Sequence, residues 1–342
     1  MLTILSGVGL LVATLAVFSL FSLKMPKGSL AMEGMANAAV ATFLVEAIHK
    51  YITGDLLGFE FLRQVGEASG SMGGVAAAIL VPIAMGVNPI YAVVAGAAVG
   101  GYGILPGFIA GYLIGFIAPV IEKKLPAGVN VIAGAIVVAP LARIIVTVVD
   151  PGVTFILSRI GETISMATDQ SPIVMGFLLG GIMKMICTSP LSAMALTAML
   201  GLTGLPMGIA AVACFGGAFS DGSVFYRLKL GDKSSIIGVM LEPLTQAPIV
   251  TANPLPIYCS NFFGGGLAGI SAAVFKIIDN APGTSSPIPG LLAPFAFNPP
   301  LKVVMALAFA ALGGLLAGNV GGLIFKYLRE KNKDAVKVSE AA

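Results

Sequence analysis

Charged residues are scarce in this chain of 342 residues. Only 10% are Asp, Glu, Lys or Arg, whereas 57% are hydrophobic and the mean hydropathy is +0.99. A soluble chain of this length needs a charged surface of roughly a quarter of its residues, so the composition excludes a soluble globular protein. The net charge of +3 is small and its basic residues cluster at segment ends, which excludes a nucleic-acid-binding stripe.

Residue types that carry catalysis or bind metals are also rare. There is one histidine, His49, which shares a helix face with Glu46 and Lys50 and is expected to stay solvated. No Walker loop, HExxH or GxSxG motif occurs, so we expect no catalytic residue, metal, cofactor or nucleotide-driven pump. The cysteines lie in apolar stretches without disulfide or metal spacing, which indicates packing: Cys187, Cys214 and Cys259.

Glycine and proline, by contrast, are abundant, with 44 and 21 residues. They alternate with Leu, Ile, Val and Ala, a texture typical of closely packed and broken transmembrane helices rather than of disorder. The runs GGYG (100–103) and GGGLAG (264–269) therefore predict close helix packing, not phosphate binding.

Long apolar runs predict an all-α polytopic membrane protein. A helix needs about 20 apolar residues to cross the hydrocarbon, and we count roughly ten such segments, some of them broken or re-entrant. The first 23 residues lack a basic start and a cleavage site, so we expect a retained helix rather than a signal peptide. Residues 31–52 form an amphipathic helix that lies on the surface or lines a cavity. The other predicted segments are 2–23, 71–86, 89–101, 103–121, 128–149, 172–187, 190–218, 255–275 and 301–326.

Basic residues suggest an orientation. Cytoplasmic loops carry an excess of Lys and Arg, so we expect the tail after Lys326 and the loop after the first helix to be cytoplasmic. The N-terminus would then lie outside. The same rule places a further loop on the cytoplasmic side, by Arg227, Lys229 and Lys233.

Five Asn-Pro or Ser-Pro pairs each precede an apolar run. The polar side chain can cap free backbone N–H groups, and proline suits the first helical position, so each pair predicts a helix start. At mid-depth, such a start would point the positive end of a helix into a cavity; at the interface it is an ordinary start. We favour the cavity for the pairs at Ser189 and Asn253. The remaining pairs begin at Asn88, Ser171 and Asn298.

A charged side chain at membrane depth costs about 2.5–3.5 kcal/mol and needs a partner or a function. Arg143 and Asp150 are seven residues apart on one helix face, and we interpret them as a structural pair that brackets a helix end. Lys184 follows a long apolar run and is expected to hold an anionic group or Glu242. Asp221 is a further charge at depth without an assigned role.

Prolines interrupt the stretch that contains four polar candidates. Four prolines within 243–256 prevent a regular helix. We therefore expect an interrupted helix over 253–269 that lines a cavity. Carboxylate and amide groups beside free backbone donors suit sugar hydroxyls, which both donate and accept hydrogen bonds. The candidates are Glu242, Gln246, Asn253 and Asn261.

Three motifs resemble a known family. GYGILPGFIAGYLIGFIAPVIEKKLP (101–126) is similar to the Gly-rich segment and Lys-Leu-Pro of the fructose-type membrane subunits, enzyme IIC, of the bacterial phosphotransferase system. GFLLGGIMKMICTSPLSAMALTAM (176–199) and EPLTQAPIVTANPLPIYCSNFFGGGLAG (242–269) resemble two later motifs of that family, in the same order and at similar separation. Overall, the chain is most similar to the free-standing IIC-like group that includes the perfringolysin-regulator-like proteins.

The second motif departs from the family. The family's Asp, Asn and Lys are absent from the matching segment Cys187–Ala193, so the resemblance does not carry over a sugar. The family's glutamate corresponds to Glu242 or is replaced by Gln246, and we favour Glu242.

The resemblance implies an elevator-type sugar permease of the bacterial cytoplasmic membrane. It implies a homodimer whose scaffold is formed by 1–175, whose substrate-binding helices are 176–326, and whose charged tail is 327–342. Separate IIA and IIB proteins would supply phosphoryl groups, so this chain would be at most the membrane component of a phosphotransferase. Lys184, Thr188 and Ser189 would join the four polar candidates in binding solute. The alternatives are a solute-sensing regulator and an ion-coupled transporter.

Overall fold

The computed structural model describes residues 2–124, 126, 128–189 and 192–340, and within these ranges the regular elements are all helices. One isolated antiparallel bridge joins Gly204 and Asp279. Seven helices are long and apolar enough to cross a membrane, or eight if the bent pair Glu60–Gly70 and Gly73–Ala84 is one span. The all-α membrane class is thus confirmed, and the expected number of about ten spans stays a prediction.

The chain divides into two compact units. Unit 1 comprises residues 1–167, 190–203 and 281–284, and unit 2 comprises 168–189, 204–280 and 285–342. The predicted boundaries between scaffold, substrate-binding helices and tail stay predictions. Apart from the last three residues of α7, unit 1 contains α1 (Leu2–Lys24), α2 (Gly28–Ala39), η1 (Val40–Leu44), η2 (Ala47–Leu56), α3 (Glu60–Gly70), α4 (Gly73–Ala84), α5 (Pro89–Ala98), α6 (Ile104–Lys124), α7 (Val129–Gln170) and α9 (Ala193–Met199).

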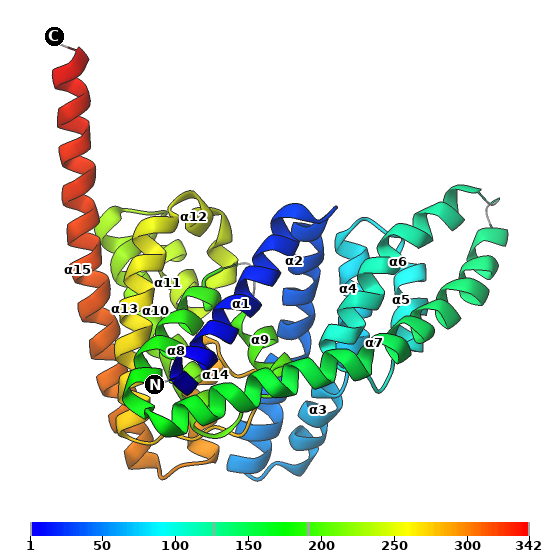
Figure 1. The fold of residues 1–342 in the computed structure, drawn as a ribbon, viewed down its shortest axis with the longest axis horizontal. Coiled ribbons are helices and arrows are strands. Elements are labelled where there is room, and N and C mark those ends of the chain that lie inside the picture. The colour runs from blue at the N-terminus through cyan, green and yellow to red at the C-terminus, as the bar shows by residue number, and fades with distance from the viewer. Residues whose placement is uncertain (1, 125, 127, 190–191, 341–342) are drawn as a thin grey trace. The chain divides into compact units, whose positions relative to one another are not determined.

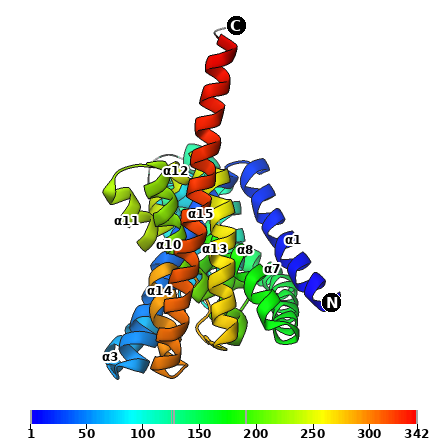
Figure 2. The same ribbon diagram turned by 90° about the vertical axis from the view of Figure 1, so that its left-hand side faces the viewer.

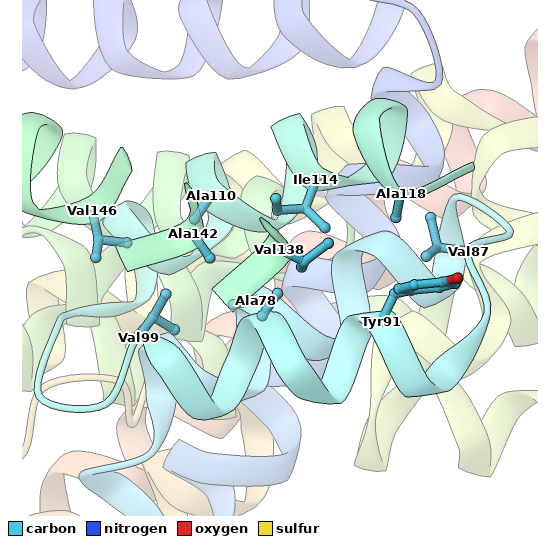
Figure 3. Packing of buried hydrophobic residues seen from close by; sticks show 11 residues of the cluster. Ala78, Val87, Tyr91, Val99, Ala110, Ile114, Ala118, Val138, Ala142 and Val146 are labelled. Carbon is cyan, nitrogen blue, oxygen red and sulfur yellow. The ribbon is translucent and has the colours of Figure 1, made fainter. Parts of the chain in front are cut away.

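Small and branched residues form the core of unit 1 between α4, α5, α6 and α7. Figure 3 shows Tyr91 of α5 and Ile114 of α6 among alanines and valines contributed by all four helices. Alanine at positions such as Ala110 and Ala142 lets the helix backbones approach closely, as in many membrane helix pairs.

Arg143 of α7 holds the end of α5. Its Nη1 donates to the carbonyl oxygens of Ala98, at 3.2 Å, and Gly100, at 3.0 Å. The guanidinium carbon also lies 4.7 Å from the centre of the Tyr102 ring. Because α7 continues through both Arg143 and Asp150, the interpretation of these residues as a pair bracketing a helix end is wrong. Free carbonyls at the end of α5 are the partners that Arg143 satisfies.

Arg143→Met is expected to lower the thermal unfolding temperature of the detergent-solubilised protein by about 2–4 °C. The variant removes two charge-assisted hydrogen bonds from a largely exposed side chain, a loss of about 1 kcal/mol. Arg159→Met is the control, since the ion pair of Arg159 with Glu162 is exposed. Equal unfolding temperatures for the two variants would show that Arg143 does not support the end of α5.

The predicted amphipathic helix 31–52 is longer than expected. Helical backbone runs from Gly28 to Leu56, and its second half is π-helical over Val40–Leu44 and Ala47–Leu56. Lys50 forms an ion pair with Glu46 at 3.1 Å. The length and composition of the whole stretch Gly28–Leu56 make it a candidate membrane span as well as an amphipathic helix.

Helices begin at three of the predicted prolines, Pro89, Pro172 and Pro254, and the last helix begins at Pro300, one residue after the predicted Pro299. Of the caps described for Asn88, Ser171 and Asn253, only that of Asn88 forms as expected, with its side chain accepting from the N–H of Ile90 at 3.0 Å. The start expected at Ser189-Pro190 falls partly outside the described residues. The predicted helix 190–218 is instead split into α9 and α10, because Gly201 and Gly204 have positive φ angles of 58° and 67° and turn the chain.

Unit 2 is built around a bundle of α8, α10, α13 and α15, which Figures 1 and 2 show with α10, α13 and α15 side by side. The elements of this unit are α8 (Pro172–Cys187), α10 (Gly204–Leu228), α11 (Lys233–Leu241), η3 (Pro243–Gln246), α12 (Ala247–Ala252), α13 (Pro254–Val274), α14 (Pro287–Leu292), η4 (Ala293–Ala296) and α15 (Pro300–Glu340).

Glycines four residues apart face one another between α8 and α13. A methyl carbon added at Gly180 would lie 2.6 Å from the carbonyl oxygen of Gly265, and one at Gly176 would lie 2.7 Å from that of Gly269. Two such small-residue faces let helix backbones touch. The prediction that GGGLAG serves helix packing is therefore confirmed.

The helical interruption lies earlier than the sequence predicted. The backbone breaks at Glu242 and Asn253, between α11, η3, α12 and α13, whereas Pro254–Val274 is one continuous helix. The expectation of an interrupted helix over 253–269 was wrong in position. Pro254 and Pro256 sit in the first turn of α13, where a missing N–H breaks no helical bond.

The basic segments of unit 2 gather at one end. Arg227, in the last turn of α10, donates to Asn319 of α15 at 2.9 Å. Ten residues later in α15, Arg329 donates to Asn253 at 2.6 Å. The loop after α10 and the end of α15 thus share one end of unit 2, and the placement of that end on the cytoplasmic side stays a prediction.

Candidate functional site

The core of unit 2 contains a buried ion pair. Lys184 Nζ of α8 lies 2.6 Å from Asp221 Oδ2 of α10, and both side chains are 0% exposed. A buried charge requires an opposite charge and further hydrogen bonds, because desolvation opposes the ionised form. The pair is therefore stable only as a unit.

Asn261 of α13 completes this polar core, which we call the Asp221 cluster: Lys184, Thr188, Asp221 and Asn261. The Asn261 Nδ2 donates to Asp221 Oδ1 at 2.7 Å and to Thr188 Oγ1 at 3.1 Å. These two bonds use both amide hydrogens and fix the orientation of the amide, since an oxygen could not donate to the carboxylate. Among the residues that the structure describes, the buried Asn261 Oδ1 has no hydrogen-bond partner.

Glycines make room for the stem of Lys184. A methyl carbon at Gly217 of α10 would lie 2.7 Å from Lys184 Cε, and one at Gly265 of α13 would lie 3.1 Å from Lys184 Cγ. The lysine thus passes between two helices at positions where neither has a side chain, and its ammonium group is brought to Asp221.

Glu242 lies at the break between α11 and η3, half-buried. Its Oε2 accepts from Ser286 Oγ at 3.1 Å, just before α14. Burial raises the pKa of the Glu242 carboxyl, and the hydrogen bonds from Ser286 and the backbone of Leu244 and the charge of Lys184 oppose that rise. The break therefore presents a carboxylate beside backbone that is not part of a continuous helix.

Comparison with protein families decides the class of protein. The family model described as "Phosphotransferase system, EIIC" matches residues 29–339. The chain belongs to this family. This EIIC protein is thus a multi-pass membrane permease of the phosphotransferase type, and the family resemblance is confirmed at that level. The fructose-type and regulator-like grouping stays a prediction, and a comparison with curated proteins finds no match.

Three of the residues predicted in this EIIC protein, namely Lys184, Thr188 and Asn261, meet in the Asp221 cluster. The other four lie at breaks in the helices. Gln246 is in η3, four residues after Glu242, and donates to Thr245 at 3.2 Å. The hydroxyl of Ser189 donates to the carbonyl of Ile186 at 2.8 Å.

Asn253 is engaged at the basic end of the unit. It donates to the carbonyl of Ile249 at 3.0 Å and accepts from Arg329 at 2.6 Å. Its side chain thus closes α12 rather than capping α13, so the predicted cap is wrong.

The sequence did not identify the partner of Lys184. Glu242 or an anionic solute was expected, and the structure gives Asp221, 37 positions later in the chain. Ser286, which binds Glu242, was also missed. The available signal was Asp221 itself, since a carboxylate inside the apolar helix Gly204–Leu228 requires a cation.

Proposed function

We propose that this permease binds and translocates a sugar or a related small polar solute. The observation that carries the proposal is the half-buried Glu242 carboxylate at the break between α11 and η3, in a member of the EIIC family. A carboxylate beside irregular backbone can accept hydrogen bonds from solute hydroxyls, and free backbone groups nearby can donate to them.

We infer a solute site that also uses Gln246, Thr188, Ser189 and Asn261. Thr188 and Ser189 lie at the end of α8 and Gln246 lies beside Glu242, so each offers a hydroxyl or amide at a helix break. Lys184 acts on this site through its contact with Asp221, which is held by Asn261.

Asn253 is engaged by Arg329 and therefore contributes less directly to the proposed solute site. Its contact with Arg329 supports a structural role at the basic end of unit 2, and it reaches the solute only when that contact opens.

The family supports further parts of the proposal. Separate IIA and IIB proteins would phosphorylate the solute during transport in the bacterial cytoplasmic membrane. The segment 176–326 would move as the substrate-binding part against the scaffold 1–175, with 327–342 as the charged tail.

Uptake into vesicles containing the purified full-length protein tests this function. A radiolabelled panel of hexoses, pentoses and polyols would be offered with and without IIA, IIB and a phosphoryl donor. We expect phosphorylated solute inside the vesicles only when the coupling proteins are present. Uptake of unmodified solute that follows an ion gradient would favour an ion-coupled transporter, and binding without uptake would favour a solute sensor.

We also expect a homodimer, as the family implies. Apolar side chains exposed on α6, such as Leu113 and Phe116, offer surface for a second copy or for lipid. Light scattering of the protein in mild detergent, corrected for bound detergent, is expected to give twice the mass of one chain. A single-chain mass at all concentrations would contradict this expectation.

A further inference from the structure

Two lysines, Lys302 and Lys326, bracket the membrane-spanning part of α15. Residues 303–325 between them contain no charged side chain. At 1.5 Å per residue this stretch extends about 35 Å, close to the hydrocarbon thickness of a bilayer. Lys326 therefore marks one boundary of the span. Figure 2 shows α15 continuing past the ends of α10 and α13.

Four basic residues lie at this boundary, and we call them the basic collar: Arg227, Lys229, Lys326 and Arg329. Arg227 packs on α15, since a methyl carbon added at Gly322 would lie 2.8 Å from its Cβ. Lys326 follows Gly322 by one helical turn and Arg329 follows it by two, so these residues share one face of α15. Lys229 comes directly after the end of α10.

Most donors of the basic collar are free to bind an anion. The Nε of Arg227 donates to a side-chain amide of α15 at 2.9 Å, while its Nη atoms have no partner among the described residues. The same part of the structure shows no hydrogen bond or ion pair for the exposed side chains of Lys229 and Lys326. Only two acids lie close to the collar in the sequence, Asp232 and Glu330, so the surface is net positive.

The basic collar adjoins an apolar surface that faces lipid. Large apolar side chains are exposed along α15 up to the boundary, including Leu316 and Leu323. Tyr226 and Tyr327, each next to a basic residue of the collar, are 70% and 65% exposed. Exposed tyrosines are typical of the level of the lipid headgroups, where the ring meets the acyl chains and the hydroxyl meets water. This combination of charge and apolar surface fits a lipid better than a soluble anion.

We propose that the basic collar binds the headgroup phosphate of an anionic phospholipid whose acyl chains lie along the exposed face of α15. Guanidinium and ammonium groups form charge-assisted hydrogen bonds with phosphate oxygens. A soluble anion would meet only the charges, whereas a lipid also covers Leu323 and the tyrosine rings. The bound lipid would hold the end of α15 at a fixed depth in the bilayer. The inference goes beyond solute transport and does not depend on it.

A tryptophan beside the basic collar can test the proposal, because the sequence contains no other. Tyr327→Trp places this reporter at the boundary. The purified full-length variant would be reconstituted into mixtures of phosphatidylglycerol and phosphatidylcholine, with one of the two lipids brominated on its acyl chains. Quenching of the tryptophan fluorescence by each brominated lipid in turn gives the relative affinity of the two lipids for this position.

We expect phosphatidylglycerol to bind beside this tryptophan about tenfold more tightly than phosphatidylcholine, or more. Lys326→Gln and Lys229→Gln should each reduce the preference about fivefold, because each basic residue near an anionic lipid surface contributes roughly that factor. Lys326→Arg keeps the charge and should keep the preference. Added salt should weaken the preference, since it screens exposed charges.

Two controls localise the effect. Lys302→Gln removes the lysine at the other end of the same span, where its Nζ donates to the carbonyl of Lys276, and should leave the preference at Tyr327→Trp unchanged. Leu312→Trp, with Tyr327 retained, moves the reporter to an exposed position in the middle of α15 and should show no preference for either headgroup.

Several results would overturn the proposal. Equal quenching by the two brominated lipids at Tyr327→Trp is one, and an equal loss of preference in Lys302→Gln and Lys326→Gln is another. Loss of the preference on addition of soluble glycerol phosphate, at constant ionic strength, would make the basic collar a site for free phosphate groups. Variants neutralised at Lys229 and Lys326 that keep the lipid preference but lose phosphoryl transfer from IIB would make it a docking surface for that protein.

Discussion

Asp221→Asn is expected to destabilise the protein by about 3–5 kcal/mol. The substitution keeps the shape of the side chain but leaves the Lys184 ammonium buried without an opposite charge. It also replaces the carboxylate that accepts from Asn261 with a neutral amide. Chemical unfolding in detergent, followed by circular dichroism, measures the loss.

A second substitution distinguishes the charge pair from packing. Lys184→Met in the Asp221→Asn background removes the uncompensated charge and is expected to restore most of the lost stability. Asp150→Asn is the matched control, because Asp150 accepts only from Thr154 among its described contacts and should change stability by about 0.5 kcal/mol or less. Strictly additive losses in the double variant would refute the coupling.

Glu242→Gln is expected to weaken solute binding about tenfold to a hundredfold while leaving the fold intact. The variant removes a charge-assisted hydrogen bond to a solute hydroxyl, a loss of about 1.5–3 kcal/mol. Its bond from Ser286 can persist, since the amide oxygen also accepts. Calorimetric titration with the solute found by uptake measures the affinity.

The pH dependence of binding gives a second readout. Burial raises the pKa of Glu242, so the carboxyl becomes neutral at a higher pH than an exposed glutamate does. A solute that needs the carboxylate is therefore expected to lose affinity as the pH falls through this raised pKa. The Gln variant should lack that dependence.

His49→Ala is the control for Glu242→Gln. His49 lies in the amphipathic stretch Ala47–Leu56, and its loss should alter neither binding nor stability appreciably. Equal solute affinity in wild-type protein and folded Glu242→Gln would remove Glu242 from the site. A joint loss of binding and stability would instead make Glu242 a structural residue.

Local signals in the sequence predicted the parts of the fold that short segments determine. Proline at the first helical position marks the starts at Pro89 and Pro254, because the residues that favour a helix start are adjacent in the sequence. Glycines spaced by four, such as Gly265 and Gly269, likewise predict a close helix contact without information about the partner.

Local sequence signals did not predict which side chains pair between helices that are distant in the sequence. From the sequence alone, either Asp221 or Glu242 could be the partner of Lys184. Only the packing of α8 against α10 selects Asp221. Arg143 was paired with Asp150 by helical spacing, but it reaches the carbonyls of a different helix. Side-chain partners of buried charges depend on which helices touch, and periodicity does not specify that.

The length of α7 has a consequence for the surrounding lipid. At 1.5 Å per residue, its 42 residues extend about 63 Å, roughly twice the hydrocarbon thickness of a bilayer. An α7 aligned with the membrane normal would leave long apolar stretches in water, including the exposed Ile132 and Phe155. A helix of this length that crosses the bilayer must do so obliquely or with a bend, and the thickness of the bilayer would then act on its tilt.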